Sequence, residues 1–404
     1  MGDARPQAVI VAAARTPMGR FLGGLAPLPA PALGGLAIRA ALARSGLDPA
    51  ELDDVIIGNV VSAGLGQAPA RQAGIAGGVP ENVGAMAVSR VCGSGLMAVM
   101  LAAQAIRAGD AHALVAGGME SMSNAPYYLY GYREGVKYGD RKVVDGLIRD
   151  GLWCAFGDCH MGGHAEYTAH KAGITREDAD RFSLESHRRA VRAIDEGAFR
   201  REIVPAEVPS RKGAVSVDTD EPPRRDTSLE ALAKLRPAFE QDMPAEVTDP
   251  VVTAGNAPGL NDGAAALIIT SEEYARAHGL RRLARISAYA TGAVAPQELF
   301  FAPVRAVRRV LEREGTSIED YGLIEANEAF AVQALADGQE LGWDWERVNV
   351  RGGAIALGHP IGASGARILT TLLYAMQDLD VERGLATLCL GGGDAVALSI
   401  ERES

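Results

Sequence analysis

Short apolar runs alternate with longer amphipathic stretches along most of this chain. Apolar runs of strand length stand at 8–12, 52–59, 113–118, 264–270 and 384–390. Stretches with helical periodicity stand at 33–45, 96–106, 307–314 and 366–376. An apolar run followed by such a stretch is typical of a βα unit. The alternation therefore predicts an α/β protein in which helices cover buried sheets.

Two segments far apart in the chain repeat the same plan. Residues 33–59 and 307–327 each run through a helix, a glycine, an acidic turn, an apolar strand and an asparagine. A second pair, 113–118 and 384–392, consists of apolar strands that end in paired glycines. Two such matches in the same order indicate that the protein contains duplicated βα halves.

The segment between these halves has a different amino-acid composition and pattern. Residues 122–249 contain a cluster of tyrosines, several prolines and a charged amphipathic helix at 176–196. We expect this segment to be an insertion that covers a site or makes subunit contacts. The N-terminal half would then comprise 1–121 and 250–272, and the C-terminal half 273–404.

Composition and charge narrow the class of partners. A formal net charge of −11 argues against nucleic acid or an anionic membrane as the main partner. No apolar run approaches the ~18 residues that cross a bilayer, so we expect no membrane association. The first residues include an acidic one and lead into an apolar strand, unlike a signal peptide. The four cysteines suit a reducing cytosol better than a disulfide framework, so we expect a cytoplasmic protein.

Cys92 stands where a β-favouring run gives way to a helix. Gly93 and Gly95 follow it and allow the backbone to turn sharply. A thiol at a helix N-terminus feels the positive end of the helix dipole, which favours the nucleophilic thiolate. The alternative is a buried structural cysteine, because free cysteine is among the most buried residue types.

Two further glycine-rich junctions carry groups that complement this thiol. His359 lies within the glycine-rich stretch 352–365, and Cys389 precedes three glycines at the end of an apolar strand. Together with Cys92 they would supply a nucleophile, its base and a second acid/base. Asn327, at the end of the repeated strand, either holds a water or an oxyanion or has an ordinary role in a turn.

Other kinds of site fail on spacing. The glycines after Cys92 lack the third glycine of a dinucleotide-binding fingerprint, and the chain has no P-loop motif. Four possible zinc ligands lie close together at Cys154, Cys159, His160 and His164. No second ligand pair accompanies them, so we expect no metal site.

Five ordered motifs resemble those of the thiolase family. They stand at 91–95, 117–126, 327–330, 352–365 and 389–392. The resemblance covers essentially the whole chain and is nearest to the acetyl-CoA acetyltransferase branch, also called acetoacetyl-CoA thiolase. It implies a five-layered α/β/α/β/α fold of two similar halves with an inserted coenzyme A-binding loop domain. It also implies a homodimer, commonly paired into a homotetramer.

The resemblance assigns roles to the catalytic candidates. Cys92 would be the nucleophile that takes up the acyl group. His359 would accept its proton and then hold the thioester oxygen, together with a water fixed by Asn327. Cys389 would be the second acid/base and remove a proton from the incoming acetyl-CoA. The backbone N–H groups of Cys92 and Gly391 would form the other oxyanion site.

The resemblance also implies a set of residues that bind coenzyme A and the acyl group. They are His160, Met161, Arg224, Ala254, Pro258 and Phe330. Pro258 departs from the family pattern, since close relatives usually have a serine there that contacts the pantetheine. The stretch 299–301, which contains Phe300 and Phe301, stands where the biosynthetic enzymes have a methionine and small residues. These departures leave the catalytic set intact but leave the acyl chain length open.

We therefore expect reversible Claisen condensation of two acetyl-CoA to acetoacetyl-CoA and CoA, by a ping-pong route, within fatty acid metabolism. CoA thioesters would be substrates, so no cofactor is expected. A degradative 3-ketoacyl-CoA thiolase of broader chain length is the nearest alternative. Carrier-protein-dependent ketoacyl synthases use a histidine where Cys389 stands, which disfavours that reaction. A non-enzymatic acyl-CoA-binding role would predict a missing catalytic residue, and none is missing.

Overall fold

The structure is a computed structural model and describes residues 6–211 and 213–403 of the 404-residue chain. Within these residues ten strands form one hydrogen-bonded sheet in the order β14-β15-β16-β13-β1-β12-β5-β3-β4, with β2 beside β12. The strands of the first half are β1 Ala8–Arg15, β2 Gly19–Arg20, β3 Asp54–Gly58, β4 Gly84–Val88, β5 Ala113–Ser121 and β12 Asn261–Ser271. Those of the second half are β13 Ala284–Ala293, β14 Leu323–Ala326, β15 Arg383–Leu390 and β16 Asp394–Arg402.

The sheet consists of two halves with matching topology. In the first half, β3 is parallel to β5, and β12 runs antiparallel between β5 and β1. In the second half, β14 is parallel to β15, and β16 runs antiparallel between β15 and β13. An isolated parallel bridge from Ile324 to Val348 takes the place of β4 in the second half. The predicted duplication is therefore confirmed at the level of strand pairing, and the halves join through two residue pairs of β1 and β13.

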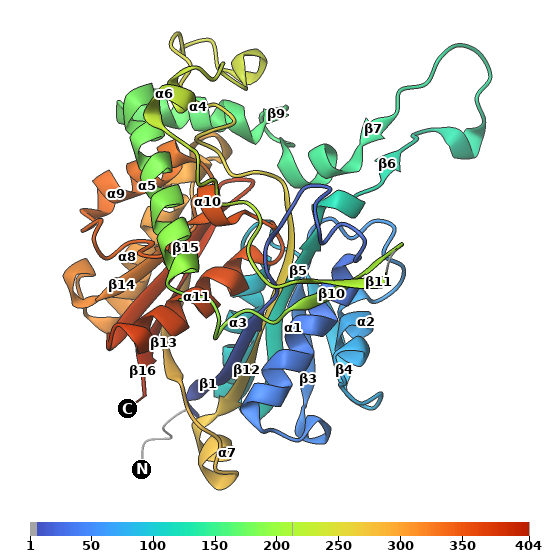
Figure 1. Cartoon of the computed structure of the whole chain (residues 1–404), viewed down its shortest axis with the longest axis vertical. Coiled ribbons are helices and arrows are strands. Elements are labelled where there is room, and N and C mark those ends of the chain that lie inside the picture. Colours follow the sequence, from blue (N-terminus) through green and yellow to red (C-terminus); the bar gives the residue numbers. More distant parts are fainter. Residues whose placement is uncertain (1–5, 212, 404) are drawn as a thin grey trace.

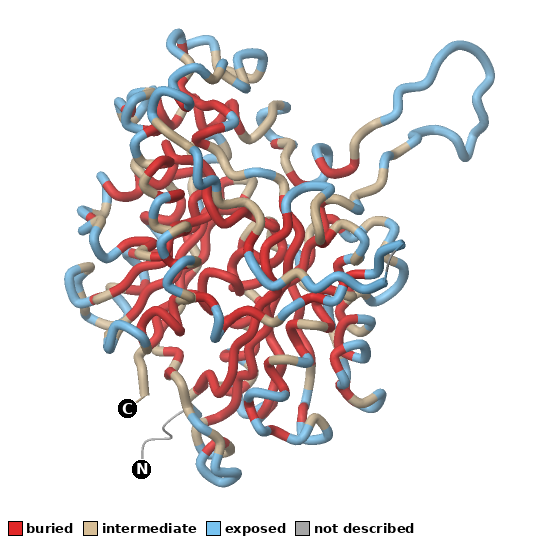
Figure 2. Tube along the Cα trace, in the orientation of Figure 1, coloured by how far each residue is buried: buried red, intermediate tan, exposed pale blue. Residues whose placement is uncertain are grey.

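Helices complete a five-layered arrangement, as Figure 1 shows. α1 (Ala30–Ser45) and α2 (Pro69–Ala76) cover the outer face of the first half-sheet, and α8 (Ala302–Glu314) covers that of the second. α3 (Ser94–Ala108) and α11 (Ser364–Asp378) lie between the two half-sheets. Figure 2 shows that burial is concentrated along the strands and central helices. The predicted α/β/α/β/α fold is confirmed.

The central helix α3 corrects one expectation from the sequence. Among the described residues, the 18-residue window Val91–Ala108 is long and apolar enough to cross a membrane, with a mean hydropathy of 1.5. The prediction that no stretch approaches this length is therefore wrong. Some 56% of the window is buried inside the structure, where α3 meets protein on several sides. A helix enclosed in this way is apolar around most of its circumference.

Two glycines allow the central helices to touch at their N-terminal ends. A Cβ atom on Gly95 of α3 would lie 2.9 Å from the backbone nitrogen of Ala366, and one on Gly365 of α11 would lie 2.4 Å from that of Leu96. Real Cβ atoms do not approach backbone so closely, so only glycine fits at either position. This contact brings the turn before α3 and the loop before α11 together.

The segment that was expected to be an insertion forms small elements above the half-sheets. Its helices are α4 Met161–Ala172, α5 Arg176–Asp195 and α6 Leu229–Ala233. Its strand pairs are β6 Tyr127–Tyr128 with β7 Val144–Asp145, β8 Trp153–Cys154 with β9 Cys159–His160, and β10 Ala206–Ser210 with β11 Gly213–Val217. The hairpin that contains β6 and β7 projects from the body and is largely exposed (Figures 1 and 2). The division of the chain into three domains stays a prediction.

The remaining helices are short or lie beside the second half. They are α7 Glu272–Ala277, α9 Ala331–Leu341 and α10 Ala354–Leu357. The predicted charged helix at 176–196 is α5, whose N-terminus carries a capping box between Thr175 and Asp178. α9 packs against α4 and α5, so the insertion and the second half share contacts near the residues described next.

Candidate active site

The turn that carries Cys92 lies immediately before α3. The hydroxyl of Ser94 donates to the carbonyl of Val91 at 2.6 Å and accepts from the N–H of Arg90 at 2.8 Å. Val91 has a φ of +46°, which is a strained backbone conformation for a β-branched residue. Such strain persists only where the surroundings enforce it, as the serine does here. The result is a half-buried Cys92 that faces a cavity between the two halves.

His359 is fixed from two sides in the loop before α11. Its backbone N–H donates to Asn261 Oδ1 at 2.9 Å, and its Nδ1 lies 2.6 Å from Ser364 Oγ. The Ser364 hydroxyl donates its own proton to the carbonyl of Pro360 at 2.8 Å. The serine oxygen must then accept from Nδ1–H of His359, which leaves Nε2 unprotonated. The loop thus selects the tautomer that can act as a base through Nε2.

Asn327 lies behind this imidazole. Its Nδ2 is 3.4 Å from His359 Nδ1, and it is 1% exposed. Its Oδ1 has no hydrogen-bond partner within the described part of the chain. A buried amide with spare hydrogen-bonding capacity is suited to holding a water molecule.

Cys389 lies near the end of β15, before a turn of three glycines. Cys389 is 2% exposed. Gly392 and Gly393 have φ of +89° and +92°, a conformation that favours glycine. The turn directs the backbone N–H of Gly391 toward the sulfur of Cys92, where it favours the thiolate. The same cavity is therefore approached by two thiols, an imidazole and a backbone N–H group.

The catalytic candidates converge on one cavity of about 280 Å³. Of the residues predicted to act in catalysis or binding, it is lined by Cys92, His160, Met161, Pro258, Phe330, His359, Cys389 and Gly391. Asn327 is not among the lining residues but lies next to His359, which is. The structure thus brings most of the predicted set together, from both halves and from the insertion.

Burial sets the charge state of the resting site. It raises the pKa of Cys92 to about 12, against the opposing effect of the N–H groups of Cys92 and Gly391. Burial also lowers the pKa of His359 to about 3, with the Arg367 charge as a further cause. The pair is therefore a neutral thiol and a neutral imidazole near pH 7. The N–H groups at the helix terminus act toward the thiolate, as expected, but loss of hydration outweighs them.

A buried carboxylate ties the segment after β3 to the loop that contains His359. Glu120 accepts hydrogen bonds from Asn59 Nδ2 at 2.8 Å, from the N–H of Val60 at 3.0 Å and from the N–H of Gly362 at 3.0 Å. Burial raises the pKa of this carboxyl to about 7. Glu120 also raises the pKa of Cys92. The sequence reading missed this residue, although it lies within one of the five family motifs.

An ion pair connects the Cys92 turn to the Gly391 turn. Nε and Nη2 of Arg90 donate to Asp394 Oδ2 at 2.9 and 2.6 Å, and the two side chains are 32% and 28% exposed. Arg90 stands two residues before the nucleophile, and Asp394 follows the glycine turn directly. The pair therefore links the segment that holds the sulfur to the segment that holds the N–H group aimed at it. The sequence reading did not predict this contact, although the charge directly after three glycines was a signal for it.

Aromatic side chains form part of the cavity wall, and Phe300 and Phe330 belong to the same buried cluster as Cys389. His160 caps α4 by accepting from the N–H of Gly162 at 3.1 Å, and its ring stacks on Phe239 at 4.6 Å between centroids. Phe330 meets Phe300 edge to face at 5.3 Å. Phe300 is 2% exposed and lines the cavity. Phe301 does not line it, so only one of the two phenylalanines singled out in the sequence bounds the cavity.

Two of the predicted binding residues lie in a neighbouring hollow. Arg224 and Ala254 line a space of about 520 Å³ that shares Ala257, Gly259 and Leu260 with the catalytic cavity. The loop 257–260 therefore borders both spaces. A long ligand that ran past this loop would contact both sets of residues.

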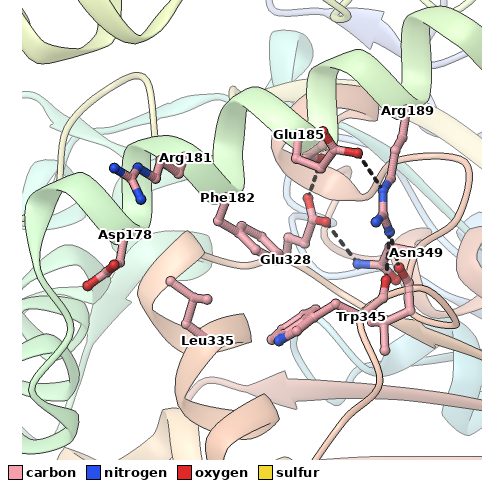
Figure 3. A pocket seen from close by; sticks show the side chains of 11 residues that line it. Asp178, Arg181, Phe182, Glu185, Arg189, Glu328, Leu335, Trp345 and Asn349 are labelled. Atoms are coloured by element: carbon pink, nitrogen blue, oxygen red, sulfur yellow. Dashed lines mark hydrogen bonds and ion pairs between the residues drawn. The ribbon is translucent and has the colours of Figure 1, made fainter.

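Glu328 follows Asn327 in the chain, and Figure 3 shows its side chain among residues of α5 and beside Asn349. It accepts from Ser186 Oγ at 2.7 Å, from Asn349 Nδ2 at 2.8 Å and from the N–H of Ile355 at 3.1 Å. These partners come from α5, the segment after α9, and α10. A separate hollow of about 260 Å³ reaches this carboxylate from the α5 side. Glu328 thus acts within the fold and faces away from the catalytic cavity.

The candidate zinc ligands do not form a metal site. Across residues 6–211 and 213–403, no group of three or more His, Cys, Asp or Glu side chains is placed to hold a metal ion. Cys159 Sγ lies 3.6 Å from His164 Nε2, whereas His160 is turned to its cap and to Phe239.

Comparisons with known proteins give a consistent result. The family model described as "Thiolase, N-terminal domain" matches residues 8–273, and that described as "Thiolase, C-terminal domain" matches residues 280–402. An acetyl-CoA acetyltransferase of Pseudomonas aeruginosa is 56% identical over 396 residues, covering 98% of this chain and 99% of the relative. One of Escherichia coli is 53% identical over 395 residues, covering 98% of each chain. The crystal structure of the Bacillus anthracis acetyl-CoA acetyltransferase covers 100% of both chains, with a TM-score of 0.96 and 40% identity.

Proposed function

The chain belongs to the thiolase family of acyltransferases, and on this premise we propose that it is an acetyl-CoA C-acetyltransferase. The reaction is the reversible condensation of two acetyl-CoA to acetoacetyl-CoA and CoA. One observation carries the proposal: the sulfurs of Cys92 and Cys389, the ring of His359 and the N–H of Gly391 line the same cavity. The relatives named acetyl-CoA acetyltransferase support the choice of substrate.

The first half-reaction transfers the acyl group to Cys92. The neutral thiol attacks the thioester carbon while Nε2 of His359 removes its proton, so no free thiolate has to exist beforehand. Burial holds the pKa of Cys389 well above its usual range, so this residue enters as a thiol. It can then protonate the departing CoA sulfur. The acyl-enzyme that results makes the kinetics ping-pong.

The second half-reaction forms the carbon–carbon bond. Cys389, now a thiolate, removes a proton from the methyl group of a second acetyl-CoA, and the carbanion attacks the acyl group on Cys92. The tetrahedral intermediate then collapses to acetoacetyl-CoA, the bond between the acyl carbon and the Cys92 sulfur breaks, and this sulfur recovers its proton from Nε2 of His359. The enolate oxygen would be held by protonated Nε2 of His359 and by a water on Asn327. The N–H groups of Cys92 and Gly391 would hold the oxygen of the tetrahedral intermediate. Fixed donors of this kind stabilise developing charge without reorganising.

The binding of coenzyme A follows from the two adjoining hollows. The pantetheine arm would run past Met161 and His160, and the nucleotide would occupy the hollow of Arg224 and Ala254. Pro258 lines the cavity without a hydroxyl, so the arm would contact this loop through apolar surface. CoA thioesters are substrates in this scheme, and no cofactor enters it.

The aromatic wall favours a short acyl group. Phe300 and Phe330 meet edge to face within the cavity. The test is a thiolysis profile over 3-ketoacyl-CoA substrates of increasing length. We expect the highest kcat/KM with acetoacetyl-CoA, and a preference for long chains would favour a degradative 3-ketoacyl-CoA thiolase instead. Mass spectrometry of the protein after exposure to acetyl-CoA should find the acetyl group on Cys92.

We also propose a cytoplasmic homodimer that pairs into a tetramer. β4 lies at one end of the strand order, and Met86 on it is 45% exposed. An exposed edge strand is a template for pairing with another chain. The projecting hairpin 127–145 carries several exposed tyrosines and suits a second contact. Light scattering of the purified protein measures the number of chains.

A further inference from the structure

Two thiols outside the catalytic cavity face each other across a small hairpin. β8 and β9 pair antiparallel, and Cys154 stands directly opposite Cys159. Both are free thiols. Directly opposed residues on antiparallel strands have Cα atoms about 4.5–5.5 Å apart, and disulfides form at about 4.4–6.8 Å. The backbone register therefore places the two cysteines within disulfide range.

A histidine lies beside one of these thiols. Nε2 of His164, in the first turn of α4, is 3.6 Å from Cys159 Sγ. Burial lowers the pKa of His164, which keeps the ring neutral and able to accept a proton. Burial also raises the pKa of Cys159 to about 11, so the thiol keeps its proton until a reaction removes it. Both shifts disfavour the thiolate in the resting protein, so activation of Cys159 depends on the direct contact between its sulfur and Nε2 of His164.

The turn of the hairpin leaves room for both sulfurs. The N–H of Gly157 donates to Cys154 Sγ at 3.3 Å. A Cβ atom on Gly157 would lie 3.2 Å from Cys159 Sγ and 3.1 Å from the His164 ring. Any larger residue would therefore press on the thiol and its base. Gly157 thus lies next to Cys159 and His164 and donates its N–H to Cys154.

Solvent can reach this pair without passing through the catalytic cavity. Cys159 and His164 line an open hollow of about 660 Å³, which also contains Gly157. Cys159 is half-buried, whereas Cys154 is 2% exposed. A small oxidant would therefore meet Cys159 first, and Cys154 would be the resolving thiol.

We propose that Cys154 and Cys159 form a reversible disulfide when the protein meets a hydroperoxide, and that this bond changes the wall of the substrate cavity. Leu152, directly before β8, and His160, at the end of β9, both line that cavity. The disulfide would join the two strands between these residues. Drawing Cys159 toward Cys154 pulls His160 away from its stack on Phe239.

The chemistry balances with the peroxide as the only added reagent. His164 takes the proton of Cys159, whose sulfur attacks one peroxide oxygen. A sulfur–oxygen bond forms, the oxygen–oxygen bond breaks, and the first water leaves with the proton from His164. The sulfur of Cys154 then attacks that of Cys159, the sulfur–oxygen bond breaks, and hydroxide leaves as the second water with the proton of Cys154. Two thiols lose two electrons, and the peroxide gains them.

The first experiment tests whether the disulfide between Cys154 and Cys159 forms. The whole protein is treated with stoichiometric hydrogen peroxide, its remaining thiols are alkylated, and its tryptic peptides are weighed. Residues 150–171 form one peptide with both cysteines, because no lysine or arginine lies between them and Lys171 ends it. We expect this peptide to be unalkylated and lighter by two hydrogens, while Cys92 and Cys389 remain alkylated. Overoxidised single cysteines, or a bond between the two catalytic thiols instead, would overturn the proposal.

The second experiment tests the role of the histidine. His164→Gln should form the disulfide at least about tenfold more slowly, because a general base has been removed. A circular dichroism spectrum equal to that of the wild type shows that the variant folds. An unchanged rate of bond formation would remove His164 from the scheme.

The third experiment tests the effect on the cavity, and this part alone depends on the proposed function. In the oxidised wild type, the KM for acetyl-CoA should rise about threefold or more, the size of one lost aromatic stack, and return on reduction. Cys159→Ser is the matched control, because it cannot form the bond and its KM should not respond to peroxide. A KM that stays constant in the wild type contradicts the effect on the cavity. Failure of the proposed activity itself would show as an inactive reduced enzyme, whereas the mass measurement stands without it.

Discussion

Each half of the chain places one side chain at the cavity through a glycine-rich turn before a central helix. The two side chains differ in how firmly their neighbours hold them. In the first half, a glycine turn leads into α3 and presents a half-buried thiol after a strained valine. In the second half, a glycine loop leads into α11 and presents an imidazole that is 7% exposed. The thiol turn is held by one serine and a partly exposed ion pair, whereas the imidazole is fixed at its backbone and at Nδ1.

This difference separates two requirements of acyl transfer. In the proposed mechanism the base must keep one tautomer and one position, because its Nε2 would serve first as acceptor and then as donor. The nucleophile has to move along the bond that it forms. A duplicated scaffold provides both groups at the N-terminal end of a central helix, and their neighbours then determine how firmly each is held. Burial, more than the helix terminus, determines their charges.

We expect the largest effect from a substitution of the proposed nucleophile in the first half. Cys92→Ser should lower kcat by at least about ten-thousandfold, because a buried serine hydroxyl is a far weaker nucleophile than a thiol. Steady-state thiolysis of acetoacetyl-CoA measures the loss. Activity within tenfold of the wild type would exclude covalent catalysis by this residue.

A smaller but still large effect is expected from the second thiol. Cys389→Ala should lower the condensation rate about a hundredfold or more, the usual contribution of a general acid/base. Exchange of the acetyl-CoA methyl protons with solvent should stop, while Cys92 should still react with iodoacetamide. Exchange at the wild-type rate would show that another group removes the proton.

An intermediate effect tests how the imidazole is held. Ser364→Ala removes the acceptor of Nδ1–H and should lower kcat about ten- to a hundredfold, with a smaller change in KM. Ser364→Thr keeps the hydroxyl and is the matched control, which should recover most of the activity. Equal losses in both variants would mean that packing, rather than the tautomer, is what the serine provides.

The smallest change in rate tests the ion pair that links the two turns. Arg90→Gln should lower kcat about two- to fivefold, the range expected for a partly exposed pair, with an unchanged KM. Arg282→Gln is the control, because its pair with Glu272 has the same 2.6 Å distance and similar exposure; Arg282 also pairs with Glu403, and it does not line the cavity. Exchange of the two charges, as Arg90→Asp with Asp394→Arg, should restore part of the loss. A loss of equal size in the control variant would show only a general effect on stability.

The pH dependence of kcat/KM for acylation should lack the bell shape that many cysteine–histidine enzymes show. The thiol of Cys92 stays protonated below a pKa of about 12, and the imidazole of His359 stays neutral above a pKa of about 3. Neither group changes charge between these limits, so this pair should produce no step in kcat/KM for the acylation half-reaction between about pH 6 and pH 9. Glu120 has a pKa of about 7, so a step near pH 7 that is absent from Glu120→Gln would belong to this carboxyl. A rise through pH 7 that persists in Glu120→Gln would indicate that the thiolate forms in the free enzyme.

Patterns local in sequence predicted the architecture and most of the cavity. Apolar periodicity gave the central helices and the duplicated halves, and glycine junctions marked Cys92, His359 and Cys389. The sequence did not predict contacts between residues far apart in the chain, such as those of Glu120 with Gly362 and of Arg90 with Asp394. The thiolate at Cys92 was predicted from a local dipole, yet the desolvation that outweighs it arises from residues far along the chain. The opposition of Cys154 and Cys159 needed the hairpin register, which spacing alone does not fix.

The glycine pair where α3 meets α11 has a consequence for how this enzyme could change over generations. A methyl group at Gly95 or Gly365 would act as a wedge between the two helix ends, and it would lengthen the proton's path from sulfur to nitrogen. Such a variant would retain every catalytic side chain and still lose the reaction. Descendants of this protein would therefore keep the reaction only if Gly95 and Gly365, which contribute no functional group, stayed unchanged.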